Sequence, residues 1–129
     1  MVLSEAWNEA ALPLLGPTIR AIRAHGVSVT VVGPGVRYRD SMPGLLARAI
    51  WRNDFARVDR SRDADVALLD RRARAIAQAE GAAYYSLYDQ ECPGGKCRLL
   101  TPGGAPYHFD DSHLTLDGAR DLVKAMPRP

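Results

Sequence analysis

The 129-residue sequence lacks an apolar run long enough to span a bilayer, which takes about 20 consecutive apolar residues. Its first residues, Met1-Val2-Leu3-Ser4, lack the basic flank and the long apolar stretch of a secretory signal peptide. Charge of either sign is also weak, with a formal net charge of +2. The arginines are scattered over expected helices and are offset by nearby acids. We therefore interpret them as solvated helix faces and predict no nucleic-acid partner.

Signatures of nucleophiles and cofactors are missing as well. Ser4, Ser86 and Ser112 are candidate nucleophiles by residue type alone, and none lies in a convincing sharp turn. Gly33-Pro34-Gly35 has the wrong spacing for a phosphate-binding loop, and Pro34 lacks an N–H group that such a loop needs. We therefore predict that the chain binds no cofactor.

Cysteine is scarce, with two residues, Cys92 and Cys97, around a tight loop that contains one proline and two glycines. This loop can bring the two sulfurs together, so we predict a local disulfide and an oxidising compartment. Two reduced thiols or half of a metal site are the alternatives. Zinc would need two further ligands at suitable spacing, and the sequence offers none, so we predict no metal site.

What is present is an alternation of strand and helix patterns. We expect strands at residues 2–4, 27–32 and 83–87, and a loop over residues 52–62. We expect helices from a cap at Asn8 to Gly26, from Ser41 through Ile50, from 63 to 80, and from Thr115 or Asp117 through Val123. This alternation predicts an α/β fold with a parallel sheet that helices cover on both faces.

Three strands make a thin sheet, and the first of them starts almost at Met1. We therefore expect residues 1–129 to form a single, partial domain that lacks one or more N-terminal strands. The edge at Val2-Leu3 would then be prone to pair with another chain. Trp7 and Trp51 are expected in the core, although Trp7, at a strand tip, is also a candidate for lining an acyl pocket.

The most informative segment runs from Phe109 to Ala119 and places Asp110 three residues before His113. An imidazole is a useful base near neutral pH, with an ordinary pKa of about 6.5, when a carboxylate fixes its tautomer. A spacing of three lets both side chains face the same way, whereas Asp111, at a spacing of two, is placed less well. A purely structural pair is the alternative. We expect His108 at the surface and His25 at a helix end.

Asp110-x-x-His113-Leu114-Thr115, followed by Gly118-Ala119, resembles the last block of the SGNH hydrolases. More specifically, the whole chain resembles the later part of the SGNH-like domain that is fused to acyltransferase family 3 membrane proteins. Further features support this resemblance: a strand that ends in Trp7, a strand that ends at Pro34 before Tyr38 and Pro43, and the cysteine loop before Tyr107 and Asp110.

The resemblance implies a flavodoxin-like, three-layer α/β/α fold with ester chemistry at the strand tips. It makes His113 the base and Asp110 its orienting partner. The family's nucleophile is a serine in a Gly-Asp-Ser block, and both this block and the glycine block of the oxyanion hole are missing here. Trp7 lies about where the oxyanion asparagine would be. Asn8 is one position further on, where a helix cap is the simpler interpretation.

The function that the resemblance implies is an SGNH-type esterase or O-acyltransferase domain that acts on acyl esters of cell-surface glycans. Such a domain would lie on the periplasmic or extracytoplasmic face of the cytoplasmic membrane, with a membrane acyltransferase domain on the same polypeptide. One alternative is an inactive remnant that binds a glycan or a partner. The other is a small flavodoxin-like module in which Asp110 and His113 are structural.

Overall fold

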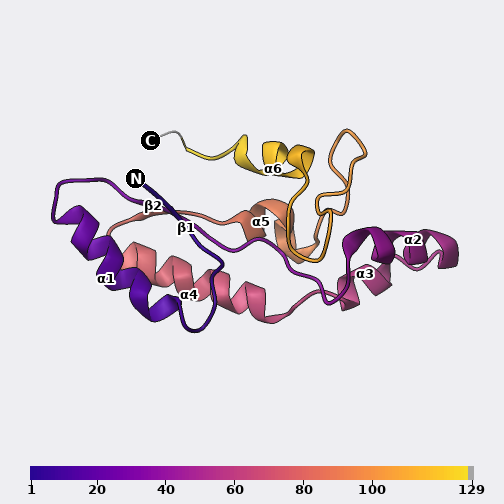
Figure 1. Cartoon of the computed structure of the whole chain (residues 1–129), viewed down its shortest axis with the longest axis horizontal. Coiled ribbons are helices and arrows are strands. Elements are labelled where there is room, and N and C mark those ends of the chain that lie inside the picture. Colours follow the sequence, from indigo (N-terminus) through magenta and orange to yellow (C-terminus); the bar gives the residue numbers. More distant parts are fainter. Residues whose placement is uncertain (128–129) are drawn as a thin grey trace. The chain divides into compact units, whose positions relative to one another are not determined.

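The computed structural model describes residues 1–127, which fall into two compact units (Figure 1). Unit 1 comprises Met1–Gly35 and Asp65–Tyr88 with Pro127, and unit 2 comprises Val36–Ala64 and Asp89–Met126. Across residues 1–127, no helix combines the length and the apolar character that a membrane crossing requires.

Unit 1 is a parallel three-stranded sheet with helices packed against it. Strands β1 (Val2–Ser4), β2 (Thr30–Val32) and β3 (Ala83–Tyr85) lie in the order β1-β2-β3. Helix α1 (Leu12–Arg23) connects β1 to β2, and α4 (Asp65–Ala79) precedes β3. The two crossover connections run in the same direction along the sheet, and right-handed crossovers of this kind place their helices on the same face. Figure 1 shows α1 and α4 side by side. The predicted α/β fold with a parallel sheet is confirmed, although the two helices of unit 1 lie on one face of the sheet and not on both.

The core of unit 1 forms where α1 and α4 meet the sheet. Its buried side chains come from α1, from α4 and from the sheet with its flanking residues, and they include Leu12, Leu15, Ile19, Val29, Val31, Leu69, Ala73 and Ala77. Trp7 belongs to this core as expected, and its indole Nε1 donates a 2.7 Å hydrogen bond to the carbonyl of Val32. Trp7 also lines, with Leu3 and Leu14, an apolar groove of about 490 Å³. That the groove holds an acyl group stays a prediction.

Asn8 organises the entry into α1. Its Oδ1 accepts hydrogen bonds of 2.9 Å from the backbone N–H groups of Ala10 and Ala11. The side chain therefore caps the turn that precedes the helix, not the helix itself as predicted, because α1 starts at Leu12 with Ala11 as its N-cap and ends at Arg23. Gly26 ends the following turn with a positive φ of 75°, a conformation that favours glycine.

A buried polar cluster lies next to the ends of β2 and β3. The carboxylate of Asp70 accepts 2.9 Å hydrogen bonds from the hydroxyls of Tyr84 and Ser86, and a 3.0 Å bond from Arg74. Gly33 lies directly against this cluster, since a β-carbon there would stand 2.2 Å from the Tyr84 hydroxyl and 2.5 Å from Asp70 Oδ1. The close approach of backbone to cluster therefore requires glycine at position 33.

Unit 2 consists mainly of short helices and loops. Its elements are α2 (Met42–Arg52), α3 (Ala56–Arg60), the end of α5 (Leu87–Glu91), a 3₁₀ turn (Pro93–Gly95) and α6 (Leu116–Val123). Thr115 caps α6, one of the two start sites expected from the sequence.

Several expectations about elements were wrong. The segment expected as a loop over 52–62 contains α3, because Val58 is fully buried and anchors a short helix. The third strand stops at Tyr85, because α5 starts at Leu87. The second strand is confined to Thr30–Val32. Trp51 is 81% exposed rather than in the core, and its ring packs beside the guanidinium of Arg52.

We expect Gly33→Ala to lower the free energy of unfolding by about 1–3 kcal/mol, because the new methyl group must displace Tyr84 and Asp70. Urea denaturation followed by circular dichroism measures the change. Gly35→Ala is the matched control, because nothing lies within 4 Å of the place that its β-carbon would take, and its effect should stay within about 0.5 kcal/mol. Equal effects of the two substitutions would contradict the steric explanation.

Candidate active site

The site is built on a tight loop of unit 2 that runs from Tyr107 to Thr115. The two ends of the loop are joined by a 2.8 Å hydrogen bond from the Thr115 N–H to the Tyr107 carbonyl. Further in, the Phe109 N–H donates to the His113 carbonyl at 3.0 Å. These backbone bonds close the loop like a hairpin and fix the relative positions of the residues at its tip.

The base of the loop is held by α6. Thr115 Oγ1 accepts a 3.0 Å hydrogen bond from the Gly118 N–H and donates a 2.7 Å bond to the Pro106 carbonyl. A β-carbon at position 118 would lie 2.5 Å from the carbonyl oxygen of Tyr107, so the close packing of helix on loop requires glycine. The Tyr107 hydroxyl donates to Asp121 on α6, and burial together with this contact raises the pKa of Tyr107 to about 12.

The tip of the loop is held by the chain around the start of α2. The Tyr38 N–H donates a 2.8 Å hydrogen bond to the Asp111 carbonyl, and the Met42 N–H donates a 3.0 Å bond to the Asp110 carbonyl. Met42 is the first residue of α2, so its N–H is one that the helix itself leaves unsatisfied. The loop backbone is therefore fixed at Asp110 and at Asp111.

Asp110 and His113 form a hydrogen-bonded dyad at this tip. Asp110 Oδ2 lies 2.7 Å from His113 Nδ1. Asp110 Oδ1 accepts bonds of 2.7 Å from the His113 N–H and 2.9 Å from the Ser112 N–H. These backbone bonds, that of His113 first, together with the imidazole, lower the pKa of Asp110 from 3.8 to about 2. The carboxylate is therefore ionised throughout the neutral range.

The other ring nitrogen of His113 faces outward. The side chain is 72% exposed, and within residues 1–127 no hydrogen bond reaches its Nε2. Phe109 stacks on the imidazole with a centroid distance of 5.7 Å and an interplanar angle of 17°. The ring is thus oriented from one edge and one face, and its Nε2 is accessible to a reacting group.

Asp111 and Ser112 do not belong to the dyad. The Ser112 hydroxyl donates a 3.0 Å bond to Asp111 Oδ1, and Asp110 alone bonds the imidazole. Among the described residues, a set with metal-ligand spacing is formed by Asp110, Asp111 and His113, whose donor atoms lie within 4.8 Å of one another. His113 Nδ1 is already engaged by Asp110, so we interpret the set as a hydrogen-bonded pair with a neighbouring acid.

A second histidine–carboxylate pair joins His108 of this loop to Glu91 and was not predicted from the sequence. His108 was expected at the surface but is fully buried, and its Nε2 lies 2.7 Å from Oε1 of the equally buried Glu91. Its ring meets Tyr38 edge-on with a centroid distance of 5.6 Å. Because the two residues are 17 positions apart, no local spacing indicates the pair.

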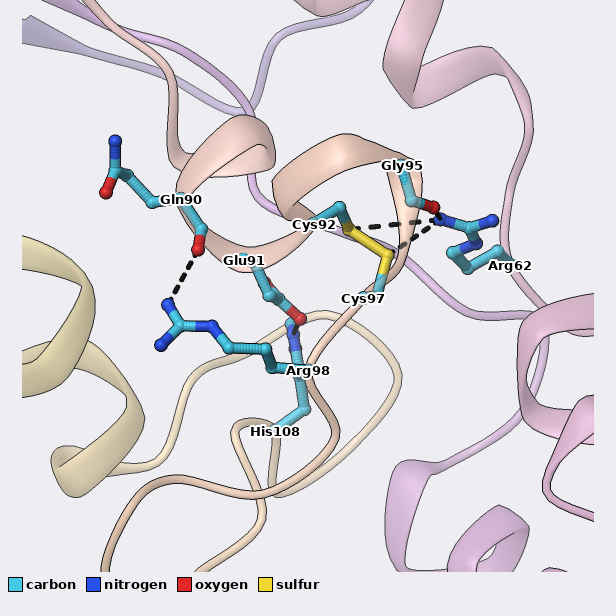
Figure 2. Close-up of a disulfide and its surroundings, with 8 residues drawn as sticks. All are labelled: Arg62, Gln90, Glu91, Cys92, Gly95, Cys97, Arg98 and His108. Carbon is cyan, nitrogen blue, oxygen red and sulfur yellow. Dashed lines mark hydrogen bonds and ion pairs between the residues drawn. A yellow bond between two sulfur atoms is a disulfide. The ribbon is translucent and has the colours of Figure 1, made fainter.

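The predicted disulfide between Cys92 and Cys97 is present. Figure 2 shows the guanidinium of Arg62 against it, with Nη1 3.1 Å from the Gly95 carbonyl and 2.7 Å from Cys97 Sγ. The two alternatives for the cysteines, free thiols and half of a metal site, are therefore excluded in this structure.

A family model described as "SGNH domain (fused to AT3 domains)" matches residues 4–128. The chain belongs to this family. The match covers both units, the dyad loop and the disulfide. Among curated proteins, the comparison finds no match.

The SGNH domain assignment agrees with a solved structure of similar fold, the periplasmic domain of a lipopolysaccharide acetyltransferase from Salmonella ser. Paratyphi A. The two share 16% sequence identity and superpose with a TM-score of 0.76. The alignment covers 95% of this chain and 52% of the Salmonella chain, so this chain spans about half the length of that neighbour.

The dyad geometry predicts how Asp110 titrates. Folding lowers the pKa of Asp110 from 3.8 to about 2. The ionised carboxylate therefore stabilises the folded state fully at a pH above 3.8, the pKa of the unfolded state, and this stabilisation is lost as the pH falls through about 2. In His113→Ala, the two backbone N–H donors remain, so the pKa of Asp110 should stay well below 3.8. Carboxyl-carbon NMR titration measures it, and a full return to 3.8 would mean that the imidazole alone sets the pKa.

Proposed function

We propose that this chain carries the base half of an SGNH-type acyl-transfer or ester-hydrolysis site. His113 is the general base, and its Nε2 removes the proton of an attacking hydroxyl. Asp110 holds Nδ1–H and stabilises the imidazolium that forms. The observation that carries the proposal is the 2.7 Å contact between Asp110 Oδ2 and His113 Nδ1, combined with an exposed Nε2.

The nucleophile is a serine that residues 1–129 do not supply. Within unit 2, no serine hydroxyl of the described residues bonds Nε2, and the hydroxyls of Ser61 and Ser112 are turned to Arg57 and Asp111. Ser86 in unit 1 is buried and bonded to Asp70. Supporting this proposal, the Salmonella neighbour has about as much chain again outside the aligned part.

We propose acyl esters of cell-surface glycans as substrates, a periplasmic or extracytoplasmic location, and a membrane acyltransferase domain as the partner on the same polypeptide. The family description names fusion to AT3 domains, and the neighbour is a periplasmic domain of a lipopolysaccharide acetyltransferase. The Cys92–Cys97 disulfide supports an oxidising compartment. In this proposal residues 1–129 act as one partial domain.

The purified 129-residue chain should show no His113-dependent hydrolysis of p-nitrophenyl acetate and no labelling by a fluorophosphonate probe. The protein expressed from the longest reading frame that contains these residues should be labelled at a serine. In that protein, His113→Ala should slow labelling about 10²- to 10⁴-fold, because the serine loses its base. Mass spectrometry of the labelled peptide identifies the serine.

His25→Ala is the matched control, since His25 is an exposed histidine of unit 1 and its substitution should leave labelling unchanged. Robust turnover by the 129-residue chain that is lost in His113→Ala would contradict an external nucleophile. Equal labelling of the longer protein with and without His113 would contradict its role as the base. A reading frame that starts at Met1 and yields an unlabelled protein would favour the inactive, ligand-binding remnant.

A further inference from the structure

We infer that Glu91 is a positioning residue for the dyad: through its buried pair with His108 it holds the loop that carries Asp110 and His113, and the Cys92–Cys97 disulfide fixes Glu91 in turn. The inference rests on the proposed function, because it assigns Glu91 a role in that same site. All the residues involved belong to unit 2.

The pair of Glu91 and His108 is buried more deeply than a surface ion pair. Both side chains are fully inaccessible, and Glu91 Oε1 lies 2.7 Å from His108 Nε2 (Figure 2). Each also has a polar atom, Glu91 Oε2 and His108 Nδ1, without a hydrogen-bond partner among the described residues. Burying two such groups is costly unless they are paired, so the contact strongly restrains where His108 can lie.

The position of Glu91 is set from the disulfide side. Cys92 follows Glu91 directly, and the Arg98 N–H, just beyond Cys97, returns to the Glu91 carbonyl at 2.9 Å. Two bonds therefore close this loop: the disulfide between Cys92 and Cys97, and the backbone hydrogen bond between Arg98 and Glu91. Arg62, just beyond the end of α3, fastens the same loop through its contacts with Gly95 and Cys97.

Arg98 extends this anchoring to the base of the dyad loop. Its Nη2 donates a 2.6 Å bond to the Gln90 carbonyl, and its Nη1 contacts Asp121 on α6 at 3.1 Å. The guanidinium also lies over the ring of Tyr107, 5.0 Å from its centroid. Arg98 thus connects three parts of unit 2: the cysteine loop, α6, and Tyr107 at the start of the loop that carries the dyad.

His108 transmits this anchoring to the dyad because it is two residues before Asp110. Its backbone pairs with Leu114, the residue after His113, so one residue flanks each side of the tip. Movement of His108 would therefore shift Asp110 Oδ1 and also the N–H groups of Ser112 and His113, which donate to that oxygen. Glu91 is far from the reacting atoms in sequence, yet through His108 it contributes to their alignment.

The test compares variants of the 129-residue protein by NMR: Glu91→Ala, Glu91→Gln and the double variant Cys92→Ser/Cys97→Ser. Glu91→Ala and the double variant should raise the pKa of Asp110 from about 2 toward 3.8 and speed hydrogen exchange at the Ser112 and His113 amides. Glu91→Gln keeps a hydrogen bond to His108 and should restore values near the wild type.

Asp70→Ala is the matched control, because Asp70 is a buried acid of unit 1, and its loss should lower stability without changing Asp110. A pKa of Asp110 that stays near 2 in folded Glu91→Ala would overturn the inference. If Glu91→Ala does not fold, an unchanged Asp110 in the cysteine double variant overturns it equally. The readout involves no turnover, so it separates failure of this inference from failure of the proposed function.

Discussion

The site depends on the carboxylate of Asp110, which accepts two backbone N–H groups on one oxygen and the imidazole on the other. The two backbone bonds, that of His113 first, together with the imidazole lower the pKa of the carboxylate from 3.8 to about 2, which favours its ionised form. An ionised acceptor on Nδ1 favours the tautomer that carries the proton there and leaves the Nε2 lone pair free. In the proposed function, the dyad is therefore a base that is prepared before any substrate arrives.

The rest of unit 2 prevents this arrangement from relaxing. A short, exposed loop would ordinarily sample many conformations, and here α6, the N-terminus of α2 and the Glu91–His108 pair each fix a different part of it. Gly118 allows α6 to approach the loop backbone closely. The similarity of fold to the Salmonella acetyltransferase domain extends over both units, since it covers 95% of the chain, and the proposed base lies in unit 2.

The parallel sheet, the disulfide and the contact between Asp110 and His113 could be predicted from the sequence because each has a local signal. β-branched runs, a Pro-Gly-Gly loop between cysteines and a spacing of three are visible within a few residues. His108 was misplaced because its burial comes from Glu91, 17 residues away, and from Tyr38. The helix over Ala56–Arg60 was missed because burial of the single residue Val58 outweighs a polar segment. Such long-range burial leaves no periodicity in the sequence.

The most direct test of the prepared base is the tautomer of His113 in the 129-residue protein, measured by long-range ¹H–¹⁵N correlation NMR at a pH where the ring is neutral. We predict a proton on Nδ1, bonded to Asp110, and an unprotonated Nε2. Asp110→Asn should disturb this preference. A neutral ring that carries its proton on Nε2 in the wild type, or that averages equally between the two tautomers, would contradict a base prepared by Asp110.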